Sequence, residues 1–163
     1  MEVSLPVVEC FHSLQGEGAH AGRSAYFIRL ASCKVGCSWC DTKNSWSEDN
    51  FPKENVLDLA KAVAHAKLKG AEFVVITGGE PLLRRDLHKL IALLKTSSSM
   101  ELAMTSNGSL LKSHAEQLVA AGLDRITISL DSIDDATFRA MNDVQFSVQR
   151  VLEGIDAART AGL

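Results

Sequence analysis

The chain has 163 residues, of which 46% are hydrophobic, so it can bury one core and has the ordinary length of a single domain. Its formal net charge of −3 argues against a general nucleic-acid binder, which would carry a basic face. It shows no apolar signal segment and no apolar run long enough to span a bilayer. We therefore expect a cytoplasmic protein whose thiols stay reduced.

Four apolar stretches, each followed by a helical pattern, organise the chain. The stretch 25–31 (AYFIRLA) is apolar and aromatic and precedes a cysteine-rich loop, which predicts a buried strand. Continuous apolar runs predict further buried strands, and apolar residues at a spacing of three to four predict helices. The elements expected after 25–31 are a helix at 55–69, a strand at 72–77, a helix at 84–95, a strand at 102–105, a helix at 115–121, a strand at 125–130 and a helix at 149–161.

This order predicts an α/β fold: a parallel sheet of about four βα units, wrapped by helices and curled toward a partial TIM-like barrel. In such sheets ligand groups lie at the carboxyl ends of the strands. A polar motif follows each expected strand here: CKVGCSWC, TGGEP, TSNG and SLDS. We therefore expect the four motifs to share one active site.

The cysteines indicate the chemistry of that site. Cys33, Cys37 and Cys40 have the spacing Cys-x3-Cys-x2-Cys on one short loop. A structural zinc site usually needs four ligands, whereas three thiolates suit a four-iron, four-sulfur cluster with one iron left open. A zinc-binding or purely structural cysteine group is the alternative. Cys10 lies far upstream in VVECF, and we expect a small buried side chain there rather than a fourth ligand.

The cysteine spacing, with the aromatic Trp39 before the last cysteine, resembles the radical S-adenosylmethionine (radical SAM) superfamily, and TGGEP resembles its second hallmark. The resemblance implies that the open iron binds the amino and carboxylate groups of SAM, and that an external donor such as flavodoxin or ferredoxin supplies electrons. The cofactor-binding positions that it implies are Gly79, Glu80, Ser106, Asn107, Ser129 and Asp131. Plain turns and helix caps are the alternative for the last four of these.

The stretch from about residue 9 to residue 46 resembles the 7-carboxy-7-deazaguanine synthase family of queuosine and related deazapurine biosynthesis. The resemblance rests on HSLQGEG, GRSA, IRL, CDTK (with Asp41) and Trp46. It implies conversion of 6-carboxy-5,6,7,8-tetrahydropterin to 7-carboxy-7-deazaguanine by a lyase that holds Mg²⁺ through Thr42. The implied substrate-binding residues are Leu14, Gln15, Gly16, Glu17, Arg29 and Thr77. An arginine in an apolar strand needs an anion, so Arg29 is expected to meet the substrate carboxylate or, alternatively, an internal Glu or Asp.

Beyond TGGEP the sequence resembles the radical SAM enzyme that begins molybdenum-cofactor synthesis from GTP. The alternatives are therefore a radical SAM enzyme acting on GTP or a peptide, or a non-catalytic iron–sulfur or zinc module. We expect residues 1–163 to be a single radical SAM domain, truncated at its C-terminus because the family barrel usually has six βα units. The expected partners are a carboxylated pterin, the electron donor and a second copy of the chain, with no nucleic acid or membrane.

Overall fold

The computed structural model describes residues 3–38, 40 and 42–163, so Trp39 and Asp41 lie outside the described residues. The strands are β1 (Ser4–Leu14), β2 (Ser24–Leu30), β3 (Lys53–Asn55), β4 (Phe73–Thr77), β5 (Glu101–Ser106) and β6 (Arg125–Ile128). The α-helices are α1 (Val56–Leu68), α2 (Leu87–Ser98), α3 (Leu111–Ala121), α4 (Asp135–Asn142) and α5 (Val148–Ala161). Short 3₁₀ turns lie at Gly18–His20 (η1), Lys43–Trp46 (η2), Glu48–Asn50 (η3) and Pro81–Leu83 (η4).

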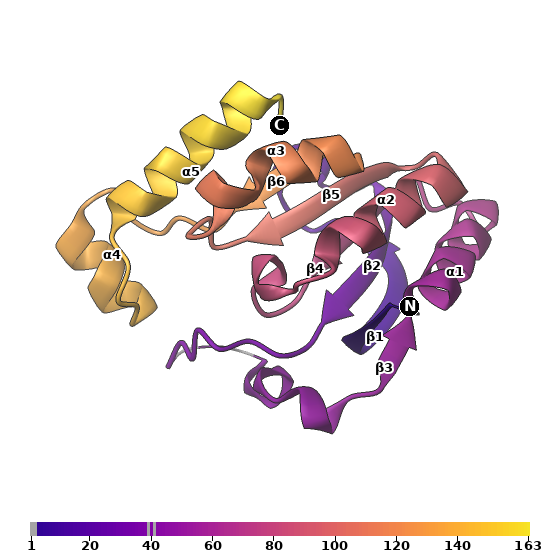
Figure 1. The fold of residues 1–163 in the computed structure, drawn as a ribbon, viewed down its shortest axis with the longest axis horizontal. Coiled ribbons are helices and arrows are strands. Elements are labelled where there is room, and N and C mark those ends of the chain that lie inside the picture. The colour runs from indigo at the N-terminus through magenta and orange to yellow at the C-terminus, as the bar shows by residue number, and fades with distance from the viewer. Residues whose placement is uncertain (1–2, 39, 41) are drawn as a thin grey trace.

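The strands form one sheet in the order β3-β1-β2-β4-β5-β6 (Figure 1). Strands β2, β4, β5 and β6 are parallel, which confirms the predicted α/β fold. The sheet also has an antiparallel part that was not predicted, because β1 pairs antiparallel with both β2 and β3. Only the first half of β1 is buried, so its polar second half lacks the apolar pattern that marks a strand.

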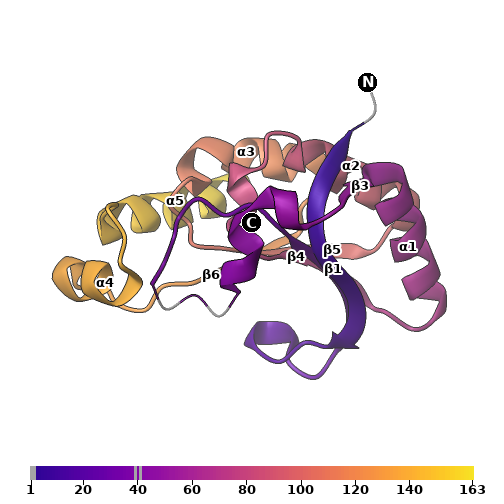
Figure 2. The same ribbon diagram turned by 90° about the horizontal axis from the view of Figure 1, so that it is seen from below.

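The helices cover one face of the sheet. Figure 2 shows α1, α2 and α3 on one side of the strands and the hairpin loop with η1 on the other. Side chains alternate between these two faces along β4, where Val74 and Ile76 pack into the main core beneath the helices. Phe73 and Val75 point the other way and pack with Ala25. Within the described residues no helix is long and apolar enough to cross a membrane.

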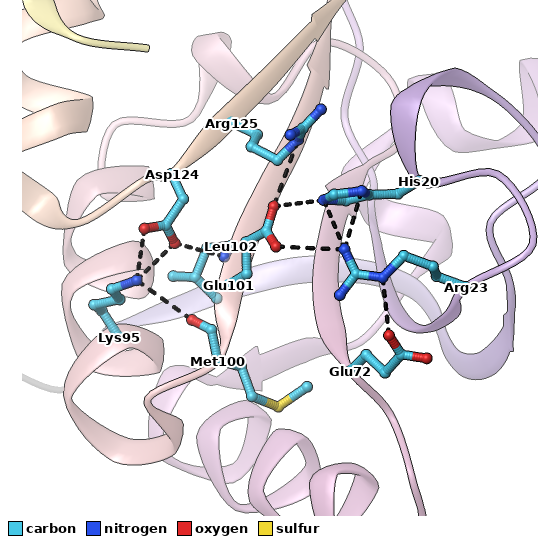
Figure 3. Close-up of polar contacts among 9 residues, drawn as sticks. All are labelled: His20, Arg23, Glu72, Lys95, Met100, Glu101, Leu102, Asp124 and Arg125. Carbon is cyan, nitrogen blue, oxygen red and sulfur yellow. Dashed lines mark hydrogen bonds and ion pairs between the residues drawn. The ribbon is translucent and has the colours of Figure 1, made fainter.

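A network of charges joins the amino-terminal ends of the parallel strands, away from the carboxyl ends (Figure 3). The carboxylate of Glu101, at the start of β5, lies 2.6 Å from Nε2 of His20, 3.5 Å from Nε of Arg125 and 3.7 Å from Nη1 of Arg23. Arg23 also pairs with Glu72 at 2.8 Å. Such partly exposed pairs each contribute little stability. Together they hold the loop between β1 and β2 against the edge of the sheet.

The helices begin and end where local chemistry allows. The side chain of Asn55 caps α1 by accepting the amide of Leu57 at 2.8 Å, as expected. Helix α2 was predicted at 84–95 but lies three residues later, because Pro81 starts a 3₁₀ turn that ends at Leu83 and is capped by Arg84. Helix α3 begins at Leu111, four residues before the predicted 115, and α4 was not predicted at all.

Leu94→Ala tests the packing of α2 on the sheet. Leu94 is fully buried in the main core, so its truncation should lower the free energy of unfolding by about 2–5 kcal/mol. Leu68→Ala is the matched control, because this leucine is also helical but 86% exposed, and its loss should cost less than about 0.5 kcal/mol. Urea denaturation of both variants measures the difference, and equal midpoints would contradict the described core.

Candidate active site

A cavity of about 350 Å³ lies at the carboxyl ends of β2, β4, β5 and β6. This volume is within the range of small-molecule sites. All four motifs that follow the predicted strands contribute to its lining, so the structure brings them together as expected. The predicted site residues that line it are Arg29, Cys33, Cys37, Cys40, Thr42, Thr77, Gly79, Ser106, Asn107 and Ser129.

The part of the cavity wall formed by α4 and the residues just beyond it was not predicted from the sequence. Phe138 and Asn142, one helical turn apart on α4, line the cavity, as do Val144 and Phe146 just beyond that helix. Phe138 is 1% exposed and packs in a second hydrophobic cluster formed mainly by α4 and α5. The signal that predicts α4 is Asp134, whose side chain caps the helix by accepting the amide of Thr137 at 2.9 Å.

The cysteine loop follows β2 and runs along the cavity. The amide of Cys40 donates to the carbonyl of Cys37 at 3.1 Å, which forms a tight turn between these two cysteines. Burial raises the pKa of the Cys37 thiol, and the neighbouring Cys33 and Cys40 raise it further. Cys37 and Val35 also pack against the cluster around Phe138. Cys37 is therefore the cysteine that packs against the wall that α4 provides, and all three cysteines border the same cavity.

The donor set fits an iron–sulfur cluster. Three thiols border one cavity that also has room for a small molecule, and thiolates are the usual ligands of such clusters. No three Cys, His, Asp or Glu side chains among the described residues form a group that could hold a single metal ion. Cys33, Cys37 and Cys40 are the residues that would hold the cluster.

Cys10 lies apart from the other cysteines. It borders a separate cavity of about 240 Å³ and packs against the main core. Burial raises the pKa of its thiol to about 11, although a hydrogen bond with Tyr26 opposes the rise. Cys10 is half-buried, which agrees in part with the expected buried side chain, and its separate cavity keeps it away from the other three cysteines.

The glycines after β4 bring separate segments of the chain into contact. Gly78 has a φ of +89°, and a Cβ there would lie 2.5 Å from the carbonyl oxygen of Leu30. Gly79 has a φ of +57°, and its Cβ would lie 2.9 Å from Cβ of Cys33. Both conformations favour glycine. The absence of side chains therefore allows the end of β4 to touch the end of β2 and the cysteine loop.

Glu80 lies behind the cavity rather than on its wall. The residue is 2% exposed, and Oε1 accepts the amide of Leu82 at 3.0 Å and the hydroxyl of Ser106 at 2.8 Å. Oε2 accepts the amide of Asn107 at 2.7 Å. Burial nevertheless raises the pKa of this carboxyl. Glu80 thus fixes two cavity residues from β5, whereas Asp131 is exposed and is not part of the cavity lining.

The predicted substrate residues divide into two groups. Arg29 and Thr77 line the large cavity, and Nη1 of Arg29 pairs with Glu9 Oε1 at 3.0 Å, which is the internal partner considered as the alternative. Gln15 and Glu17 instead border a small cavity of about 30 Å³.

The two cavities share one lining residue, Thr105. Oε1 of Gln15 is buried and has no hydrogen-bond partner in the described part of the chain. Leu14 is 64% exposed, and Gly16 is also exposed. The structure therefore does not bring the Leu14–Glu17 stretch to the large cavity.

Comparison with known proteins places these features in a family. The family described as Radical SAM superfamily matches residues 28–163. A 7-carboxy-7-deazaguanine synthase from Prochlorococcus marinus is 50% identical over 127 residues, covering 78% of this chain and 52% of that protein. A GTP 3',8-cyclase from Staphylococcus saprophyticus is 40% identical over 150 residues, covering 86% of this chain and 44% of that protein. Both resemblances seen in the sequence are thereby confirmed.

Among solved structures, the crystal structure of QueE from Escherichia coli is similar with a TM-score of 0.57 and 35% identity. The match covers 65% of this chain and 54% of that one. This chain spans about half the length of the curated relatives that it matches.

Glu80→Gln should remove a pH-dependent part of the stability. Because burial raises the pKa of Glu80 above its ordinary 4.5, the folded protein binds this proton more tightly than the unfolded chain does. The contribution of the Glu80 proton to the free energy of unfolding is complete below pH 4.5, the ordinary pKa. It is lost as the pH rises through the raised pKa of the folded protein. The difference in free energy of unfolding between wild type and variant should therefore shrink as the pH rises from 4.5, as measured by urea denaturation.

Glu153→Gln is the control for that measurement. The ammonium of Lys112 holds the pKa of the Glu153 carboxyl below its usual value, so the pH dependence of this variant should have the opposite sign. If the difference in free energy of unfolding between wild type and Glu80→Gln stayed constant with pH, burial would not raise the pKa of Glu80.

Proposed function

This chain belongs to the radical SAM superfamily, and from that premise we propose that it carries a four-iron, four-sulfur cluster on Cys33, Cys37 and Cys40 and binds SAM beside it. The observation that carries the proposal is the meeting of these three thiols with the glycine turn after β4 at one cavity. When bound, the cluster would supply the electron that cleaves SAM to methionine and a 5′-deoxyadenosyl radical.

In this proposal the residues of the chain bind and orient SAM and protect the reaction from water. Gly79 offers its backbone next to Cys33, and Ser106, Asn107 and Ser129 offer polar groups to SAM. Glu80 acts by holding the ends of β4 and β5 in register, and Asp131 stays a predicted contact to SAM.

The cavity also has apolar lining residues. They include Val35, Trp46, Phe138, Val144 and Phe146. Such residues would exclude water and side reactions from a reactive intermediate.

For the substrate we propose 6-carboxy-5,6,7,8-tetrahydropterin, converted to 7-carboxy-7-deazaguanine by carbon–nitrogen lyase chemistry. Support comes from the relatives named 7-carboxy-7-deazaguanine synthase at 46–50% identity. Arg29 lies at the cavity and would exchange Glu9 for the substrate carboxylate, since a guanidinium binds a carboxylate through two parallel hydrogen bonds. Thr77 would contact the substrate, and Thr42 would help to hold Mg²⁺, which prefers oxygen ligands.

Gln15 stays a proposed substrate contact on the resemblance, and its buried amide oxygen, which has no partner within the described residues, borders the small cavity. Leu14, Gly16 and Glu17 stay proposals that rest on the resemblance alone. An external electron donor such as flavodoxin or ferredoxin, a cytoplasmic location and a homodimer are likewise predictions.

A second candidate substrate is GTP. It is favoured by the GTP 3',8-cyclase relatives, whose similarity covers a larger share of this chain, 86–87%, than that of the synthases. The two candidates share the cluster and SAM and differ in what Arg29 binds.

Alanine at Cys33, Cys37 or Cys40 should abolish uptake of the cluster, because each variant leaves two thiolates where three are needed. Cys10→Ala is the matched control and should retain full iron content, since Cys10 borders a different cavity. Iron and sulfide analysis after anaerobic reconstitution measures the outcome, and the visible spectrum of the wild type should change when SAM is added. Loss of iron in the Cys10 variant would show that Cys10 is a ligand.

Arg29→Lys should lower turnover of the carboxylated pterin by about one to two orders of magnitude, because lysine keeps the charge but loses the planar two-pronged donor. SAM binding should persist. The assay is run with Mg²⁺ present, and Arg159→Lys on the exposed part of α5 is the control. Protein that cleaves SAM, ignores the pterin and consumes GTP would assign the function to the second candidate.

A further inference from the structure

Arg84 is a half-buried cation that lies next to the cysteine loop. It lies directly after the turn η4, and its Nη2 donates to the backbone carbonyl of Ser32. Among the described residues Arg84 forms no ion pair with Asp or Glu. The neighbouring Arg85 is exposed. A buried charge is costly unless it is compensated. The position of Arg84 therefore indicates an anion or a fixed dipole that the arginine stabilises.

The carbonyl that Arg84 binds belongs to a strained turn. Ser32 is 8% exposed and has a φ of +72°, a conformation that residues other than glycine rarely adopt. Its amide donates to the carbonyl of Ser45 at 2.6 Å. This turn leads the chain from β2 into the cysteine loop, and Cys33 is the next residue. Arg84 and Ser45 thus hold the start of the loop from two sides.

Arg84 lies close to Cys33, because its guanidinium binds the carbonyl of the preceding residue, Ser32. Burial lowers the pKa of the Arg84 guanidinium, whereas Cys33, Glu48 and Glu80 oppose that effect. Arginine stays protonated at any ordinary pH. A fixed positive charge therefore lies within electrostatic reach of the first thiol of the loop.

We propose that Arg84 is a positioning residue for the iron–sulfur cluster: its guanidinium clamps the Ser32 carbonyl, which fixes Cys33, and its charge favours reduction of the cluster. One-electron reduction adds one negative charge to a cluster held by three thiolates, so a nearby cation stabilises the reduced form. The effect on reduction rests on the proposed function. The clamp on the loop does not, because it is a property of the chain without iron.

The test compares Arg84→Gln, Arg84→Lys and the exposed control Arg85→Gln with the wild type. In iron-free protein, hydrogen exchange of the amides at 30–36 should be at least about tenfold faster in Arg84→Gln and unchanged in Arg85→Gln. After anaerobic reconstitution, a dithionite titration followed by electron paramagnetic resonance gives the reduction potential. It should fall in Arg84→Gln and stay close to wild type in Arg84→Lys, which keeps the charge.

The outcomes separate this proposal from the proposed function. The role of Arg84 would be overturned if Arg84→Gln showed the hydrogen exchange of the wild type and a reduction potential no lower than that of Arg85→Gln. Fast exchange with loss of iron uptake in Arg84→Gln would support the clamp, and a lowered potential in both Arg84 variants would overturn the role of the charge. Failure of the wild type to take up a cluster would overturn the proposed function, while hydrogen exchange would still decide whether Arg84 holds the loop.

Discussion

The close packing of the turn after β4 determines the shape of the cavity. Gly78 leaves no room for a side chain against Leu30, and Gly79 leaves none against Cys33. The next residue, Glu80, turns its carboxylate inward and binds Ser106 and the amide of Asn107. Three consecutive residues therefore fix the ends of β2 and β5 and the start of the cysteine loop. A shift of this turn would move Ser106, Asn107 and the start of the cysteine loop together.

The two ends of the parallel strands have different roles. At the amino-terminal ends, Glu101 gathers His20, Arg23 and Arg125 into a partly exposed network that holds the β1–β2 loop in place. At the carboxyl ends, polar and apolar groups surround open space, and Ser106, Asn107 and Arg29 also pair with carboxylates beside it. This division agrees with the general behaviour of βα units, in which one end stabilises and the other binds.

Much of the fold was predictable, because β4 is a continuous apolar run, β2, β5 and β6 are rich in apolar residues, and parallel strands must end at one edge of the sheet. The same geometry made the shared cavity predictable from four motifs. Helix α4 was missed because it has only eight residues and a mostly polar surface, so its contribution through Phe138 depends on tertiary packing. The inward direction of the Glu80 carboxylate could not be predicted, since a glutamate in a turn is ordinarily exposed. The separation of Gln15 from Arg29 follows from the pairing of β1 with β2, which leaves no sequence pattern.

The two kinds of relative overlap along the chain, because the synthase match covers 78% of it and the cyclase match covers 86%. The β1–β2 hairpin carries Arg29 and Gln15, whereas the proposed cofactor groups follow β4, β5 and β6. Arg29 is already neutralised by Glu9 and lies over the ring of Phe11 at 5.6 Å. A substrate anion must therefore compete with a carboxylate from the same hairpin, and only a ligand that offers a well-placed planar anion gains from the exchange. In the proposed function the hairpin thus selects the substrate, while the parallel strands supply a reaction centre that both families share.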